Sequence, residues 1–283
     1  MDNEKISGFA PVNGIRMYYE IYLPTRLREA RATAHAVSEE GRQAGGGEKI
    51  PLILLHGGGS TIESTFGNLL PLLRPYGKII AVELQSHGRS GSRPGAQTFI
   101  QDADDVAALL DFLKIEKANI LGFSNGGTTT LQIAIRHPEL INKLIVISAS
   151  YSRDGMITGF FDSMDHATID NMPQPLKDAY LKVNPDKEGL MLMFTKDRDR
   201  MIHFSDIPES EIKAIKFPTL IMLGDHDVVT NEHAVKMAHD ISNSQLSIFP
   251  GTHGSFIGEV CSVKPGSKIP KMSADLILEF LAE

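Results

Sequence analysis

The chain has 283 residues, 42% of them hydrophobic, and a formal net charge of −7 at pH 7. This length is ample for one core domain with an insertion, and the acidic balance argues against nucleic acid as a partner. A single cysteine, Cys261, excludes an intrachain disulfide, and the chain lacks any run of about 18 apolar residues, so we expect no membrane span. Because the segment from Met1 to Ser7 is polar and charged instead of an apolar leader, we expect a cytoplasmic protein.

Strands and helices are expected to alternate along most of the chain. Residues 15–22 alternate between apolar and polar side chains and predict an early edge strand. Residues 26–49, rich in Arg, Ala, Glu and Gly, then interrupt the pattern. From Pro51 onward the alternation is regular until residues 151–216, which predict short helices separated by prolines. This pattern is typical of an α/β fold with a mostly parallel sheet and helices on both faces.

A glycine-rich loop follows the first of the buried strands. Residues 50–59 predict a strand that ends in His-Gly-Gly-Gly. In an acyl-transfer site such a loop supplies a backbone N–H to the oxyanion, and we predict that this donor is Gly58, with Gly59 next. A dinucleotide-binding loop does not fit, because a fingerprint that began at Gly57 would need glycine where the chain has Ile62.

Ser124 lies at a predicted strand-to-helix turn. It follows the apolar run at residues 119–121, with Gly122 two positions before it and Gly126 two positions after it. A small-x-Ser-x-small turn of this kind exposes the serine hydroxyl, and the glycines avoid a clash where the chain reverses. The N–H of the next residue, Asn125, is then the first oxyanion donor. Taken alone, the motif is also compatible with an ordinary glycine-rich turn.

Two strands near the end of the chain are each followed by candidate catalytic side chains. Residues 219–224 predict a buried strand followed by Asp225 and Asp227. Residues 246–249 predict another strand, and His253 comes shortly after it. A serine nucleophile needs a histidine base and a carboxylate that orients it, in the chain order Ser, acid, His. Because the carboxyl ends of parallel strands meet at one edge of a sheet, we predict that His253 is the base and that one aspartate orients it.

These motifs together resemble the α/β-hydrolase superfamily, and in particular its capped, single-domain esterases and lipases. The likeness covers nearly all of the chain. Residues 82–90 resemble the family's segment at the end of the fourth strand, and residues 104–111 resemble the helix that leads to the serine strand.

The resemblance implies which aspartate orients the base. The family's acid usually occupies the last position of Gly-x-x-Asp, which maps onto Gly224 and Asp227. A less common variant places the acid after the sixth strand, but here no acidic residue follows that strand before Asp154. The implied triad is therefore Ser124, Asp227 and His253.

The resemblance also implies how the chain is divided. Residues 1–150 and 217–283 correspond to the hydrolase core, and residues 151–216 correspond to an inserted helical cap. The family usually crosses the gap at residues 26–49 with a short turn, so we interpret this segment as a surface insertion.

The cap is expected to cover the substrate. It holds six of the chain's eleven methionines, and flexible methionine side chains can form an adaptable apolar wall. We predict that Met164, Met172 and Met193 contact the substrate and that Tyr151 borders the pocket. Packing of the cap against the core is the competing interpretation of the same side chains.

The resemblance and the serine nucleophile together imply a reaction class. Dehalogenases and epoxide hydrolases of this fold carry Asp where this chain has Ser124, so we expect an acyl-enzyme and hydrolysis of a small-molecule ester or lactone. An apolar cap favours a bulky substrate, including a macrocyclic lactone such as a macrolide. We expect no cofactor. We also expect no metal, because none of the ten histidines forms a His-x-x-x-His pair with a supporting acid on a helix.

Three other functions remain open from the sequence. The same triad could hydrolyse a carbon–carbon bond in a dienoate ring-cleavage product, or act on peroxide as a perhydrolase. A receptor of the same fold that binds its ligand with little turnover is the third. We expect the protein to be a monomer or a weak homo-oligomer.

Overall fold

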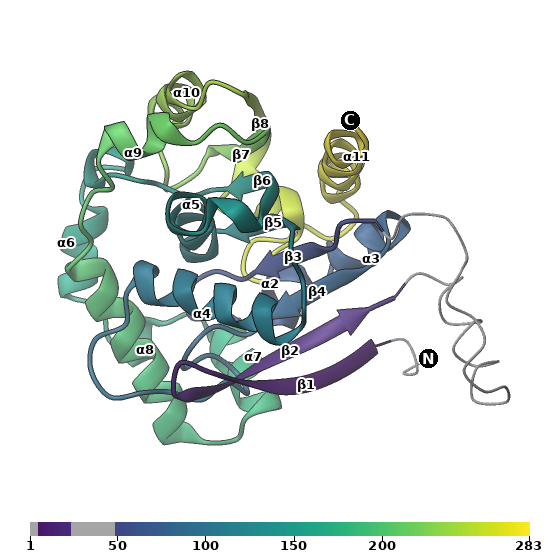
Figure 1. Ribbon diagram of the computed structural model, residues 1–283. Coiled ribbons are helices and arrows are strands. Elements are labelled where there is room, and N and C mark those ends of the chain that lie inside the picture. Colours follow the sequence, from purple (N-terminus) through teal and green to yellow (C-terminus); the bar gives the residue numbers. More distant parts are fainter. Residues whose placement is uncertain (1–4, 24–48) are drawn as a thin grey trace, which may run out of the picture.

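The computed structural model describes residues 5–23 and 49–283 (Figure 1). The strands are β1 Lys5–Val12, β2 Ile15–Tyr22, β3 Leu52–Leu55, β4 Ile79–Val82, β5 Ala118–Phe123, β6 Ile141–Ile147, β7 Thr219–His226 and β8 Ser244–Thr252. The helices outside the β6–β7 connection are α2 Ile62–Phe66, α3 Leu70–Leu73, η1 Arg74–Tyr76, α4 Phe99–Phe112, α5 Asn125–Arg136, η2 Pro138–Leu140, α10 Asn231–Asp240, η5 Ser255–Ile257 and α11 Ile269–Ala282. The insertion predicted at residues 26–49 lies outside the described residues except for Lys49. Within the described ranges, no helix is both long and apolar enough to cross a lipid bilayer.

One sheet contains all eight of these strands, in the order β1-β2-β4-β3-β5-β6-β7-β8. The pairs β1–β2 and β2–β4 are antiparallel, and every other neighbouring pair is parallel. The chain leaves β3 for β4 on one side and returns to β5 on the other, so the strand order reverses beside β3. In parallel sheets the carboxyl ends of the strands at such a reversal form the ligand crevice. The mostly parallel α/β fold predicted from the sequence is confirmed.

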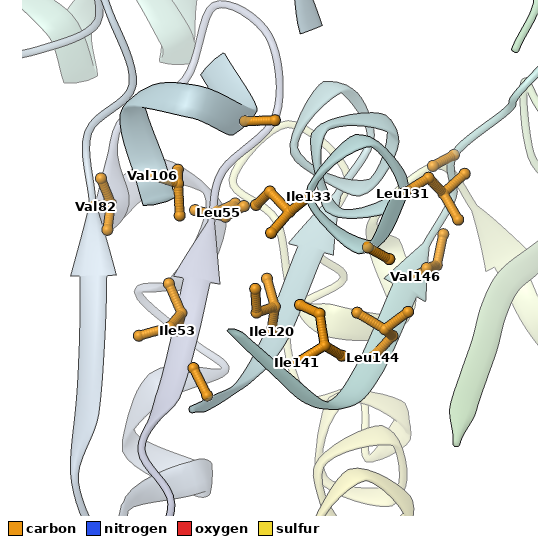
Figure 2. Packing of buried hydrophobic residues seen from close by; sticks show 14 of the residues in the cluster. Ile53, Leu55, Val82, Val106, Ile120, Leu131, Ile133, Ile141, Leu144 and Val146 are labelled. Carbon is orange, nitrogen blue, oxygen red and sulfur yellow. The ribbon is translucent and has the colours of Figure 1, made fainter. Parts of the chain in front are cut away.

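The central strands are apolar throughout because both faces of the sheet are covered by helices. Successive side chains of a strand point to opposite faces. Ile53 and Leu55 of β3 therefore pack toward α4 and α5, and Leu55 lies between Val106 and Ile133 (Figure 2). Leu52 and Leu54 of β3 point to the opposite face and belong to a second core cluster, under α2, α3 and α11. The two clusters hold the strands rigidly, and with them the loops at their carboxyl ends.

A helical region connects β6 to β7. It consists of η3 Arg153–Gly155, α6 Phe160–Asp165, η4 Ile169–Asn171, α7 Gln174–Val183, α8 Lys187–Ile202 and α9 Glu209–Ala214. We call this region, residues 153–214, the cap. In Figure 1 its green helices α6, α7 and α8 lie on the side of the molecule opposite α11. The cap has a small apolar core of its own, which includes Tyr180, Leu190 and Met193.

Candidate active site

Ser124 occupies a tight turn between β5 and α5. Its backbone has φ 54° and ψ −120°, a conformation that a residue with a side chain adopts only when the surroundings impose it. A Cβ atom on Gly122 would overlap the carbonyl oxygen of Gly126, and one on Gly126 would overlap the carbonyl oxygen of Leu55. Only glycine fits at both positions, so this sequence can bring the helix start against the strand ends and expose the serine.

The ring of His253 lies between Ser124 and Asp227. Its Nε2 is 3.1 Å from Ser124 Oγ, and its Nδ1 is 2.6 Å from Asp227 Oδ1. The ring also packs against Phe123, with the centroids 4.8 Å apart. The three residues come from the carboxyl ends of β5, β7 and β8, which the parallel topology places side by side. The structure thus brings the three predicted triad residues together in the order nucleophile, base and acid.

Asp227 is the member of the pair Asp225 and Asp227 that points toward the histidine. It is buried, and its oxygens accept hydrogen bonds from Ser148 Oγ at 2.6 Å and from the Val228 N–H at 2.7 Å. Burial alone would raise the pKa of Asp227, but His253 and the Ser148 hydroxyl hold that pKa below its ordinary value. Asp225 is exposed and accepts a hydrogen bond from the Gly251 N–H at 2.7 Å instead. Asp227 is therefore an ionised carboxylate fixed on His253.

Gly58 and Asn125, which line the cavity at Ser124, have backbone N–H groups with no hydrogen-bond partner among the described residues. The Asn125 N–H is free because it belongs to the first turn of α5. The prediction that Gly59 is a further oxyanion donor is wrong. Its N–H donates to Asp197 Oδ2 at 2.6 Å, so it is not available to an oxyanion.

A cavity of about 350 Å³ opens above Ser124 and His253. Its wall is mostly apolar and comes largely from the cap. Met164 and Met172 line it. The other apolar side chains of the wall are those of Ala149, Met156, Phe160, Phe161, Ala167, Pro173, Leu176, Phe194, Met201, Phe204, Val228 and Val229.

Two predicted pocket residues lie elsewhere. Tyr151 does not line the cavity: its ring packs on His233, with the centroids 4.4 Å apart, and its hydroxyl donates to Asp240. The neighbouring Ser150 lines the cavity instead, and its hydroxyl donates to the Ser152 carbonyl oxygen at 2.6 Å. Met193 is also absent from the cavity wall, because it is enclosed in the apolar core of the cap.

Two site residues were missed in the sequence. Ser148, directly after β6, donates its hydroxyl to Asp227 and lines the cavity. A polar residue at the end of a buried strand was the available signal for it. Asp197 in α8 lines the cavity and binds the loop after β3. No local pattern marks it, because its partner Gly59 lies far away in the chain.

The arrangement suits nucleophilic catalysis. His253 is within proton-transfer distance of the Ser124 hydroxyl, and Asp227 can steady the imidazolium that would form. The N–H groups of Gly58 and Asn125, in residues that line the cavity with Ser124, have no partner in the described part of the chain. In the part of the chain that the structure describes, no group of three or more His, Cys, Asp or Glu residues is arranged to hold a metal ion.

Comparison with known families agrees with this geometry. A family model described as the alpha/beta hydrolase fold matches residues 50–180, which contain the glycine loop after β3 and the turn at Ser124. The chain belongs to the α/β-hydrolase superfamily. This hydrolase is 25% identical over 227 residues to the 2-hydroxymuconate semialdehyde hydrolase of Pseudomonas sp. strain CF600, an alignment that covers 72% of this chain and 80% of the relative.

Solved structures share the fold of this hydrolase over almost its whole length. The enol-lactonase of Burkholderia xenovorans LB400 superposes with a TM-score of 0.70 at 21% identity, covering 98% of this chain and 100% of the other. Est816, described as an N-acyl homoserine lactone degrading enzyme, superposes with a TM-score of 0.66 at 20% identity, covering 96% and 100%. The protein is a serine hydrolase of the α/β fold whose relatives act on different bonds.

Proposed function

We propose that this hydrolase cleaves a carboxylic ester or lactone through an acyl-enzyme on Ser124. The observation that carries the proposal is the position of the His253 ring, 3.1 Å from Ser124 Oγ and 2.6 Å from Asp227, at the floor of an apolar cavity. A serine activated in this way attacks a carbonyl carbon, and the apolar wall above it suits the hydrocarbon part of an ester.

The proposed reaction has two halves. His253 takes the proton of Ser124 while its Oγ attacks the ester carbonyl, and the N–H groups of Asn125 and Gly58 stabilise the oxyanion by about 3 kcal/mol each. The imidazolium, steadied by Asp227, gives its proton to the alkoxide as the carbon–oxygen bond breaks. His253 then takes a proton from water, whose oxygen attacks the acyl-enzyme, and returns a proton to Ser124 as the acid leaves.

The cavity favours a compact apolar substrate. Its volume of about 350 Å³ is near the lower end of small-molecule sites, about 300–1,000 Å³. One acyl chain or a small lactone with an apolar substituent fits it, whereas a macrocycle would remain largely outside. The comparisons lend no support to a macrolide substrate.

The charges of the wall favour an ester over a dienoate ring-cleavage product. A dienoate substrate carries a carboxylate and needs a free cation to bind it. Arg198 is the one Lys or Arg side chain in the described wall, and its guanidinium already donates to Asp199 at 2.7 Å. Asp197 adds a carboxylate to the same wall. An anionic substrate would therefore find no free cation in the described part of the wall.

A substrate panel tests the proposal. We expect p-nitrophenyl octanoate and an N-acyl homoserine lactone to be hydrolysed with kcat/KM at least about 100-fold above that for 2-hydroxy-6-oxohexa-2,4-dienoate, because binding a carboxylate without a cation costs several kcal/mol. Initial rates measured by absorbance and mass spectrometry give these ratios. A fluorophosphonate probe should label Ser124 once per chain.

The panel also separates the other functions. A dienoate hydrolysed best would mean a carbon–carbon bond hydrolase, and faster turnover with hydrogen peroxide than with water as acyl acceptor would mean a perhydrolase. A wild-type protein that the fluorophosphonate does not label would contradict the serine hydrolase mechanism and favour a receptor.

Selectivity among esters is expected to depend on the two methionines that line the cavity. Met164→Ala and Met172→Ala should each lower kcat/KM for the octanoyl ester by about 10-fold, because apolar contacts with the chain are lost, about 1–3 kcal/mol. The acetyl ester does not reach these side chains, so its kcat/KM should stay within about twofold. Steady-state kinetics on both esters measure the change in preference.

Met193 provides the matched control. It lies in the cap core instead of the cavity wall, so Met193→Ala should lower stability by about 2–5 kcal/mol without changing the octanoyl-to-acetyl ratio. Urea unfolding measures the stability. An unchanged ratio in both cavity variants, or a changed ratio in Met193→Ala, would mean that the cavity wall has been misassigned.

A further inference from the structure

The carboxylate of Asp197 connects the cap to the loop that follows β3. Asp197 belongs to α8, yet its Oδ2 accepts a hydrogen bond from the Gly59 N–H at 2.6 Å. The same oxygen is 2.7 Å from Nε2 of His87, and Oδ1 accepts from the guanidinium of Arg200. The residue is buried, with 8% of its surface exposed, and it is not part of the triad.

Two groups that can carry positive charge, His87 and Arg200, lie against Asp197. Nδ1 of His87 lies 2.8 Å from the Gln85 carbonyl oxygen, and its Nε2 lies 2.7 Å from Asp197 Oδ2 and 3.2 Å from the Gly59 nitrogen. Burial alone would lower the pKa of His87, but the Asp197 carboxylate raises it. Burial alone would likewise raise the pKa of Asp197, but His87 and Arg200 hold it below its ordinary value. Arg200 also donates to Asp102 at 2.6 Å.

This network surrounds the peptide groups that carry the second oxyanion donor. The Gly57 carbonyl oxygen, in the same peptide plane as the Gly58 N–H, is 2.8 Å from Nδ1 of His56. The next peptide plane, between Gly58 and Gly59, is held by the bond to Asp197. Gly59 has φ 66°, and consecutive glycines have little intrinsic preference for one conformation. External hydrogen bonds must therefore determine where the Gly58 N–H points.

We propose that Asp197 is a positioning residue that holds the glycine loop with the Gly58 N–H directed at the developing oxyanion. The proposal rests on the ester or lactone hydrolysis proposed above. Asp197 touches no reacting atom in this scheme; it acts through the Gly58–Gly59 peptide. An oxyanion hole lowers the barrier only when its donors are already oriented, so loosening this peptide slows the chemical step more than it weakens substrate binding.

The primary test is Asp197→Asn, which keeps the shape and one acceptor oxygen but removes the charge that pairs with His87 and Arg200. We expect kcat for p-nitrophenyl butyrate to fall by about 10- to 100-fold, with KM within about threefold. The rate constant of fluorophosphonate labelling should fall by a similar factor, because the tetrahedral phosphorus adduct uses the same donors. The labelled fraction at completion should stay at one Ser124 per chain, which shows that the chain is folded.

Two further variants sharpen the test. Asp197→Glu keeps the charge with a longer side chain, and it should recover kcat to within about tenfold of wild type. Asp178→Asn makes the same chemical change at an exposed position of cap helix α7, where Asp178 accepts from Gln174 at 2.6 Å, and it should leave kcat within about twofold.

The outcomes distinguish the two proposals. A wild-type kcat in Asp197→Asn, or a loss confined to KM or to the labelled fraction, would overturn the positioning role while leaving ester hydrolysis intact. A wild-type protein that neither labels nor hydrolyses esters would overturn the proposed function first, and the positioning role with it.

Discussion

Replacing Ser124 by alanine is expected to lower kcat for p-nitrophenyl esters by about 10⁵- to 10⁶-fold, the largest effect of any single change in this chain. The variant has no nucleophile, so only direct attack by water remains, aided by the oxyanion donors. Folding should be unaffected, because Gly122 and Gly126 allow the tight turn. Alanine is smaller than serine, so it fits the same position without a clash. Stopped-time assays at high enzyme concentration measure the residual rate, and circular dichroism checks the fold.

The control for this variant is Ser205→Ala, at an exposed position that does not line the active-site cavity. It should retain kcat within about twofold. Contaminating esterases are excluded by fluorophosphonate labelling, which should disappear in Ser124→Ala and persist in Ser205→Ala. If purified Ser124→Ala retained near-wild-type hydrolysis, the nucleophile would have to be another residue.

Replacing Asp227 by asparagine is expected to lower kcat by about 10⁴-fold. The carboxylate accepts the Nδ1–H of His253 and so keeps Nε2 free to take the serine proton. An amide at this position can present its NH₂ group to Nδ1, which stabilises the wrong tautomer and leaves the imidazolium without a counter-charge. Because the Ser148 hydroxyl and the Gly224 N–H, which donate to the other oxygen of Asp227, can still bond to the amide oxygen, we expect the protein to fold. Steady-state kinetics at saturating ester measure kcat.

The matched control is Asp225→Asn, two residues away in the same strand end. Asp225 is exposed, and it accepts from the Gly251 N–H, a bond that the amide oxygen of asparagine can replace. Its kcat should stay within about threefold of wild type. Similar losses of kcat in the two variants, or a greater loss at position 225, would mean that Asp227 is not the residue that orients His253.

The geometry of the candidate catalytic centre could be predicted from the sequence because its parts are local. The turn at Ser124 needs glycines two residues away on each side, so its geometry is visible in one short segment. The acid and the base each follow a buried strand, and the carboxyl ends of parallel strands lie at the same edge of the sheet. Knowledge of the family then singled out Asp227 from Asp225. Amphipathic patterns and apolar strands were likewise sufficient for the mostly parallel sheet.

The tertiary structure decided which side chains form the wall and support the loop. Tyr151 packs on His233 of α10 while Ser150 lines the cavity, and this contact joins segments far apart in the chain, so composition carries no information about it. Met164 and Met193 have the same side chain, but Met164 lines the cavity and Met193 lies in the cap core. The packing of α6, α7 and α8 decides this difference.

Asp197 shows most clearly why these contacts could not be predicted from the sequence. Its partners Gly59 and His87 lie on loops after β3 and β4, far from α8 in the chain, and they meet it only after the cap packs over the sheet. The sequence by itself determined the chemistry at Ser124, because local turns and strand ends place those atoms. The shape of the cavity and the support of the oxyanion loop were decided by folding alone, because they depend on contacts between segments that no local pattern relates.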